Sequence, residues 1–156
     1  MEFKKSMIFL GADHRGFKYK EALKRALTVR GVLFEDCGNM ALVPDDDFPE
    51  FALAVAGKVS QAPNEHLGIV ICGSGSGVAM AANKVRGARA AVAWNLITAQ
   101  LAREHDFANV LAIAADHVDI TTAEAMVFKY LESQPLVNVE RYARRINEIS
   151  CLEPKC

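Results

Sequence analysis

The sequence predicts an α/β fold: a three-layer sandwich in which helices cover both faces of a five-stranded parallel sheet, followed by a C-terminal helix. Short apolar runs alternate regularly with segments whose apolar residues have helical spacing. The run at 67–72 is continuously apolar, as is typical of a strand buried on both faces. Because neighbouring parallel strands are joined by right-handed helical crossovers, this alternation indicates a parallel sheet covered on both sides.

The elements of the first half follow in order. Residues 7–13 form an apolar run with a polar end, and helical spacing continues over 17–30 until Gly31 ends it. A second strand is expected over 32–37, and after a loop a helix is expected over 48–61. The acidic run Asp45, Asp46 and Asp47 precedes that helix, where carboxylates cap N-terminal amides while remaining solvated.

The second half continues the alternation. The strand at 67–72 runs directly into a glycine-rich turn at 73–77 and a small-residue helix to about residue 85. The remaining expected elements are a strand over 88–94, a helix over 96–104, a strand over 109–115, a helix over 122–132 and an amphipathic helix over 137–149. We expect a single domain over 1–150 and a polar tail over 151–156.

Composition excludes several classes of protein. The chain has 156 residues, of which 51% are hydrophobic and 24% charged, which suits one globular domain and is too apolar for a disordered chain. A net charge of -1 argues against broad binding to nucleic acid or to a membrane surface. No apolar run approaches the roughly 18 residues that span a bilayer, and residues 1–6 lack the apolar core of a signal peptide. We therefore expect a cytoplasmic protein.

The four cysteines show no C-x-x-C pair and no spacing typical of a disulfide framework or a zinc site. We expect reduced thiols and no metal. Cys37 follows a predicted strand, where a small buried hydrophobic role is expected, and Cys151 and Cys156 lie in the polar tail. Cys72 differs because it precedes the glycine-rich turn.

Ligands of open α/β sheets bind beyond the carboxyl ends of the strands, where the winding direction reverses. The strand ends with suitable chemistry are Asp13-His14 and Cys72-Gly73. A strand order of 2-1-3-4-5 makes these two ends adjacent. We infer that order from where the polar, reactive residues lie, since the periodicity of apolar residues does not establish a strand order.

The turn at 73–77 contains three glycines, which allow backbone amides to approach an anion or a developing oxyanion. Tight packing between strand and helix is the alternative. The Cys72 thiol beside these amides is in a setting that favours a thiolate acting as base or nucleophile, the alternative being an inert buried cysteine. His14 is either a ligand-binding or a buried, hydrogen-bonded residue, and His105 either a reactive group or a helix C-cap.

Arg141 and Arg145 are four residues apart, so they project from one face of the last predicted helix. Guanidinium groups in this arrangement suit a phosphate, although a solvated surface is the alternative. Arg144 lies on a different face and is expected to pair with Glu140 or Glu148.

Four motifs in one order resemble ribose-5-phosphate isomerase type B, in the superfamily that includes galactose-6-phosphate isomerase. They cover nearly the whole chain: Gly11-Ala12-Asp13-His14-Arg15-Gly16-Phe17; Cys72-Gly73-Ser74-Gly75-Ser76-Gly77 with Ala81-Ala82-Asn83-Lys84; Arg103-Glu104-His105 with Ala108-Asn109-Val110-Leu111; and the segment from Arg141 to Ile146. Four motifs in register are far more specific than any one of them.

The resemblance implies a Rossmann-like fold, no metal or organic cofactor, and aldose-ketose isomerisation of a phosphosugar through an enediol. It assigns three catalytic residues: Cys72 as the base, His105 as the group that opens the sugar ring, and Ser74 in the loop that stabilises the enediolate. It further implies a homodimer or homotetramer whose active sites are shared between subunits. The substrate-binding residues that it implies are Asp13, His14, Gly73, Gly75, Ser76, Gly77, Asp106, Arg141 and Arg145.

Several positions depart from the family pattern. Ser74 replaces a usual Thr, Asp106 replaces Asn, and Asp116 stands where the family often has a phosphate-binding Arg. These extra carboxylates should repel an anionic substrate unless they point away or bind hydroxyls, and Arg15, where a small residue is common, offers a compensating charge.

The leading hypothesis is conversion of ribose 5-phosphate to ribulose 5-phosphate. A six-carbon phosphosugar or another aldose is the nearest alternative substrate. From other classes, Cys72 with His105 as its base also suits a thiol hydrolase or acyl-transfer enzyme, and a non-catalytic sugar-phosphate binding protein is a third possibility.

Overall fold

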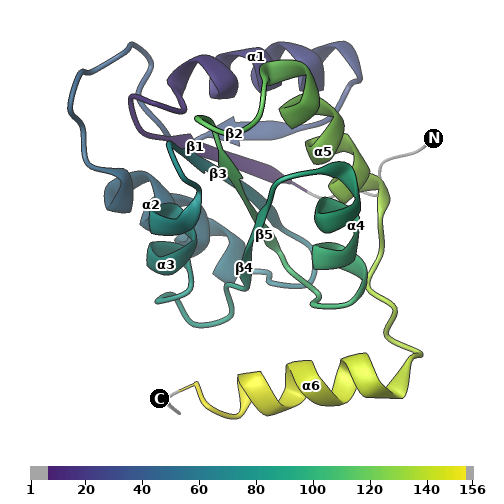
Figure 1. The fold of residues 1–156 in the computed structure, drawn as a ribbon. Coiled ribbons are helices and arrows are strands. Elements are labelled where there is room, and N and C mark those ends of the chain that lie inside the picture. The colour runs from purple at the N-terminus through teal and green to yellow at the C-terminus, as the bar shows by residue number, and fades with distance from the viewer. Residues whose placement is uncertain (1–6, 154–156) are drawn as a thin grey trace.

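The computed structural model describes residues 7–153. Every predicted strand and helix is present, and Figure 1 shows their arrangement. In chain order the elements are β1 (Ile8–Ala12), α1 (Phe17–Val29), β2 (Phe34–Asp36), α2 (Phe48–Ser60), β3 (Leu67–Cys72), α3 (Ser76–Ala82), β4 (Ala90–Ala93), α4 (Leu96–Glu104), β5 (Val110–Ala114), α5 (Ile120–Glu132) and α6 (Glu140–Ser150).

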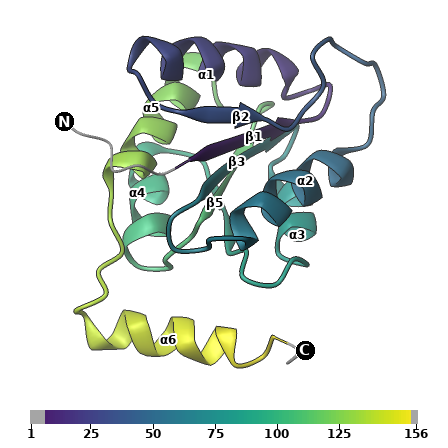
Figure 2. The ribbon, with the colours of Figure 1, turned by 180° about the vertical axis from the view of Figure 1, so that it is seen from behind.

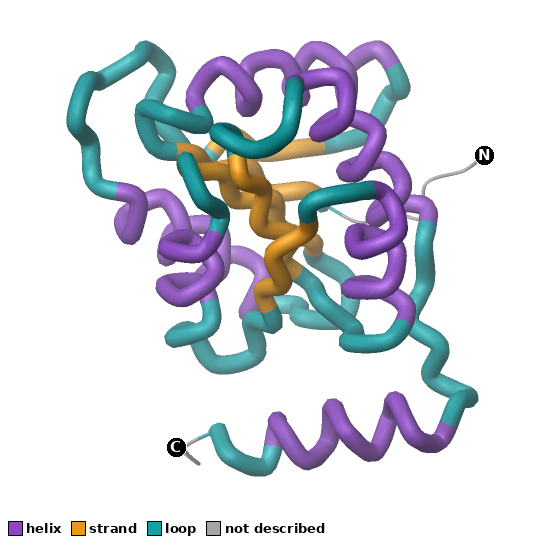
Figure 3. The backbone as a smooth tube through the Cα atoms, in the orientation of Figure 1, coloured by secondary structure: helices purple, strands orange, loops and turns teal. Residues whose placement is uncertain are grey.

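The sheet separates two apolar clusters, one under each helical layer (Figure 3). On one face, side chains of β1, β3 and β5 pack with α1, α4 and α5, with Leu23, Leu27 and Met126 fully buried. On the other face, α2 and α3 cover the sheet, and Cys72 belongs to this second cluster. Burial on both faces explains the continuously apolar sequence of β3.

All strands of the sheet are parallel, and their order is β2-β1-β3-β5-β4. The expected order 2-1-3-4-5 is correct for the first three strands and wrong for the last two. The five residues of β5 are all buried, whereas only Ala93 of β4 is buried, so β4 suits the edge and β5 the interior. This exchange places Asp116, two residues after β5, beside the end of β3, where its N–H donates to the Gly73 carbonyl at 3.0 Å.

Helix α6 lies apart from the layered body and runs past the side of the sheet where α4 ends (Figures 1 and 2). Only Tyr142 and Ile146 of this helix are buried. The connecting segment is held by the Leu136 N–H, which donates to the Glu104 carbonyl at 3.0 Å, and Glu153 accepts from the Gly87 N–H at 3.0 Å. Arg144 pairs with Glu140 and Glu148, as its position predicts.

The cysteines of the described part of the chain are unpaired. Cys37 is half-buried, and burial raises the pKa of its thiol to about 11. Cys151 is exposed, and Cys156 lies outside the described residues. Within 7–153, no helix is long and apolar enough to cross a membrane, and no cluster of His, Cys, Asp and Glu could hold a metal ion.

Asn109 joins three segments at the start of β5. Its side chain donates to the carbonyls of Pro63 and Gly87, at 3.0 and 2.8 Å, and accepts from the Arg89 N–H at 2.7 Å. Asn109 is fully buried, so no water replaces these bonds when the amide is removed. The residue therefore fixes the loops that lead into β3, β4 and β5.

We expect Asn109→Ala to lower the free energy of unfolding by about 2–4 kcal/mol, because it leaves buried backbone groups without partners. Asn83→Ala is the matched control: it removes two similar bonds to Ala90 at an exposed site, where water can replace them. Urea denaturation at equal protein concentration measures both. Equal losses in the two variants would contradict the proposed role of burial.

Candidate active site

Parallel register brings three strand ends together at one edge of the sheet. Ala12 pairs with Ile71, and Cys72 pairs with Ala114. Asp13 therefore lies directly beside Cys72 on one side, with His14 following it in the chain, and Asp116 lies on the other side. The prediction that the first and third strand ends are adjacent is confirmed.

Cys72 ends β3 with 4% of its surface exposed. The Gly75 N–H donates a hydrogen bond to Cys72 Sγ at 3.2 Å. Gly75 has a φ of 73°, in the left-handed region that favours glycine, and this conformation allows the turn to fold back over the sulfur. The thiol is thus buried and held by a backbone amide of the glycine-rich turn.

The rest of the turn supports this geometry. Ser74 and Ser76 are exposed, and Ser74 Oγ accepts from the Ser76 N–H at 3.3 Å. A Cβ atom added at Gly77 would lie 2.8 Å from the Phe48 ring, so this glycine lets α3 pack closely against the start of α2. Gly77 therefore serves close packing between two helices, while Gly75 contacts the thiol and lies close against the backbone of β5.

Asp13 is 5% exposed. Its Oδ1 accepts from the N–H groups of Arg15 and Gly16, at 3.0 and 3.1 Å. Burial raises the pKa of this carboxyl, and the two backbone hydrogen bonds partly oppose the shift. Asp13 thus shapes the turn after β1 in addition to facing the site.

His14 is held by Asp46, from the loop before α2. Asp46 Oδ1 accepts from the His14 N–H at 2.6 Å and lies 3.0 Å from His14 Nδ1. This hydrogen bond is the main cause that raises the pKa of His14, and burial opposes it. The N-cap residue of α2 is Asp47, and its side chain forms no capping hydrogen bond. The oxygens of Asp46 bind His14 and Asn39, so the expected capping role is not found for Asp46 either.

Arg15 and Asp116 form a bidentate ion pair, at 3.2 Å for Nε to Oδ1 and 2.5 Å for Nη2 to Oδ2. The pair lies against Gly73, since a Cβ atom added there would be 2.7 Å from Arg15 Nε and from Asp116 Oδ2. Both side chains are partly exposed. The charge expected to repel an anionic substrate is therefore compensated by Arg15.

The remaining predicted site residues lie elsewhere in this chain. His105 is the C-cap of α4, and its ring stacks on Tyr142 with centroids 4.2 Å apart. Asp106 follows His105, and Arg141 and Arg145 are exposed on α6. This group lies near the beginning of β5, whereas Cys72 pairs with the end of that strand, about 13 Å farther along. One chain therefore carries the predicted residues as two separate groups.

Sequence reasoning missed two contacts. Asp46 was expected to act at the helix start, and nothing in an acidic run of three indicates which member binds His14. The stacking of Tyr142 on His105 joins residues of α4 and α6, for which the sequence carried no signal beyond the amphipathic pattern of α6.

Together these features define a Rossmann-like α/β protein with a buried thiol, and a candidate site around it, at the carboxyl edge of its sheet. The model of the Ribose/Galactose Isomerase family matches residues 8–149. The chain belongs to this family.

Individual relatives agree with this assignment. The chain is 41% identical over 140 residues to ribose-5-phosphate isomerase B of Mycolicibacterium paratuberculosis, covering 90% of this chain and 87% of the relative. It is 35% identical over 148 residues to ribose-5-phosphate isomerase B of Escherichia coli K12, covering 95% and 97%. The solved structure of ribose-5-phosphate isomerase B from Mycoplasma genitalium with bound ribulose-5-phosphate is similar, with a TM-score of 0.91, 37% identity and coverage of 96% and 97%.

An alanine in the left-handed conformation costs about 1–2 kcal/mol. We expect Gly75→Ala to lower the free energy of unfolding by more than this amount. The added Cβ would also lie 3.2 Å from backbone atoms of Ile113 and Ala114. Gly31→Ala is the control, because Gly31 has a similar φ of 66° with no atom within 4 Å of the added Cβ. Denaturation curves compare the two, and an equal loss would contradict crowding at the thiol turn.

Proposed function

We propose that this protein interconverts ribose 5-phosphate and ribulose 5-phosphate by moving a proton between C1 and C2 through an enediolate. The observation that carries this proposal is the Cys72 thiol, buried under the glycine-rich turn and flanked by Asp13 and His14. The names of the relatives, and the ribulose-5-phosphate bound to the Mycoplasma genitalium protein, support the same substrate pair.

The chemistry assigns a role to each part of the edge. Removing a proton from a carbon next to a carbonyl requires a base and fixed donors where negative charge develops. Cys72 is the base, and the turn Gly73, Ser74, Gly75, Ser76 and Gly77 supplies amides and hydroxyls to the enediolate. Asp13 and His14 bind substrate hydroxyls. These steps need no redox cofactor, since the oxidation states of C1 and C2 exchange within one molecule.

His105, Asp106, Arg141 and Arg145 complete the site from a second copy of the chain. His105 opens the sugar ring, a task suited to an imidazole because its two nitrogens can donate and accept protons, and Asp106 binds a hydroxyl. The two arginines bind the phosphate and use its binding energy to orient the reacting carbons. The separation of this group from Cys72 within one chain supports a homodimer with shared sites.

Exposed apolar side chains support the same assembly. They lie on α3, just after β4 and on α4, and these helices adjoin β4 (Figure 1). The set comprises Met80, Trp94, Leu96, Ile97 and Leu101. A second copy would cover this surface and the open edge of β4, which among residues 7–153 pairs only with β5.

Cys72→Ala should lower kcat for ribose 5-phosphate by about 10²–10⁴ because the proton acceptor is lost. Cys151→Ala, which removes an exposed thiol from the end of the chain, should leave kcat unchanged. The assay follows ribulose 5-phosphate formation and deuterium incorporation at the carbon next to the carbonyl in heavy water. Unchanged exchange in Cys72→Ala would refute the assigned base, and faster turnover of a six-carbon aldose phosphate would reassign the substrate.

Complementation tests the shared site. Cys72→Ala and His105→Ala are each expected to be inactive, and their mixed dimer contains one site with both residues intact. Co-refolding equal amounts should restore about a quarter of the wild-type specific activity, because half of the dimers are mixed and half of their sites are complete. Mixing either variant with itself is the control. No recovery, with mixed dimers verified by mass spectrometry, would show that both residues act in one chain.

A further inference from the structure

A histidine and a carboxylate from distant parts of the chain form a pair beside Cys72. His14 and Asp46 are 32 residues apart, and one oxygen of Asp46 meets both the backbone N–H and the ring Nδ1 of His14. The side chain of Asp46 is 10% exposed, against 31% for His14. The carboxylate thus lies behind the ring, and the ring is the more accessible of the two.

This contact fixes the chemical state of the ring. An ionised carboxylate only accepts hydrogen bonds, so the ring nitrogen that faces Asp46, Nδ1, carries the proton. In the neutral ring Nε2 is then the acceptor, and in the protonated ring both nitrogens donate. Asp46 therefore decides which nitrogen is free to meet a ligand, and the second contact, to the backbone, limits rotation of the residue.

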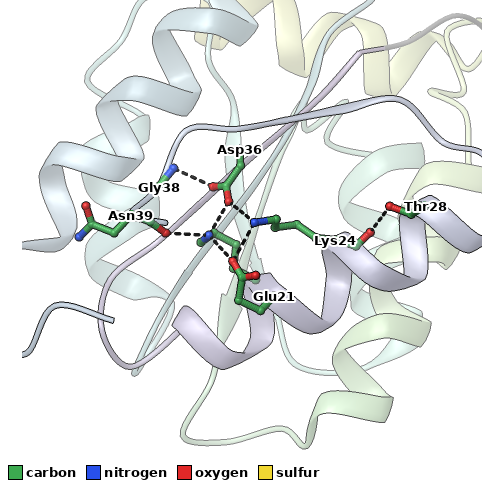
Figure 4. A network of polar contacts seen from close by, with 7 residues as sticks. Glu21, Lys24, Thr28, Asp36, Gly38 and Asn39 are labelled. Atoms are coloured by element: carbon green, nitrogen blue, oxygen red, sulfur yellow. Dashed lines mark hydrogen bonds and ion pairs between the residues drawn. The ribbon is translucent and has the colours of Figure 1, made fainter. Parts of the chain in front are cut away.

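The loop that carries Asp46 is itself fixed. Asp46 Oδ2 accepts from the Asn39 side-chain amide at 3.0 Å, so both oxygens of the carboxylate are used. The Asn39 carbonyl in turn accepts from Lys20 Nζ at 3.1 Å. Figure 4 shows this end of the network, with Asn39 beside the charged groups of α1 and β2.

Lys20 is fully buried and anchors the network. Its Nζ lies 2.5 Å from Asp36 Oδ2 and 2.7 Å from Glu21 Oε1, and Lys24 binds the same two carboxylates (Figure 4). Burial acts to raise the pKa of Asp36, but the hydrogen bonds from the two lysines outweigh it and the pKa is lowered. A buried charge with such partners is costly to displace, which makes this cluster a rigid support.

We propose that Asp46 is a positioning residue that, held by Asn39 and the buried Lys20, keeps the proton on His14 Nδ1 and presents Nε2 to a substrate hydroxyl beside Cys72. The proposal rests on the proposed function for the identity of the substrate, while the state of the ring is a property of the protein alone. Capping of helix α2 does not explain the position of Asp46, because the oxygens of Asp46 bind His14 and Asn39.

The variant Asp46→Asn keeps the size of the side chain and removes its charge. We expect kcat/KM for ribose 5-phosphate to fall by about tenfold to a hundredfold, because the ring loses its fixed orientation. Asp45→Asn is the matched control: it removes the same charge one residue away, at an exposed position whose φ of 59° asparagine tolerates. It should change kcat/KM by less than about twofold.

Nitrogen NMR of the His14 ring supplies a readout that does not depend on catalysis. Two carboxylates raise the pKa of His14, Asp46 through its hydrogen bond and Asp13 through its charge, while burial lowers it. Asp46→Asn should therefore lower the pKa of His14 and weaken the preference for a proton on Nδ1, because one acceptor oxygen of the carboxylate becomes an NH₂ donor. Asn39→Ala should shift the tautomer in the same direction by a smaller amount, because Asp46 loses one of its two supports.

The outcomes separate this proposal from the proposed function. An unchanged His14 tautomer and titration in folded Asp46→Asn overturns the positioning role, whatever the activity. An altered ring with unchanged kcat/KM also overturns it. If the wild type turns over no aldose phosphate, the proposed function fails, and a shift of the His14 resonances on adding ribose 5-phosphate to wild type but not to Asp46→Asn still supports presentation of Nε2 to a ligand.

Discussion

Parallel hydrogen bonding of β3 to β1 on one side and to β5 on the other determines which residues share the site. The register pairs Ala12 with Ile71 and Cys72 with Ala114, so the three strands end together. Every side chain at this edge comes from a residue that follows one of these ends or from a loop that folds over them. A one-residue slip would turn Cys72 to the opposite face, because side chains of a strand alternate between faces.

Three carboxylates that surround the end of β3 each have a partner. Asp13 accepts two backbone N–H groups, Asp46 binds His14 and Asn39, and Asp116 is paired with Arg15. An anionic ligand therefore meets compensated charge beside Cys72. The same partners order the turns around the thiol, so electrostatic compensation and local rigidity arise from one set of contacts.

The direction of the helices explains why the predicted residues form two separate groups within one chain. In an alternating parallel fold each helix returns the chain to the edge where strands begin, so the C-cap of α4, His105, lies at the opposite edge from Cys72. Tyr142 stacks on this histidine and ties α6 to the same end. Family membership comes from the whole chain, whereas the two groups of predicted residues lie at opposite edges of the sheet of one chain.

The sequence by itself determined the alternation of strands and helices, the central place of β3 and the thiol before the glycine-rich turn. These features are encoded locally: apolar spacing, continuous burial and the backbone freedom of Gly75 each involve only a few neighbouring residues. Only the tertiary structure decided that β5 lies between β3 and β4, that Asp46 binds His14 and that Asp116 pairs with Arg15. These outcomes depend on strand pairing and on contacts between residues 32 and 101 positions apart, for which periodicity carries no information.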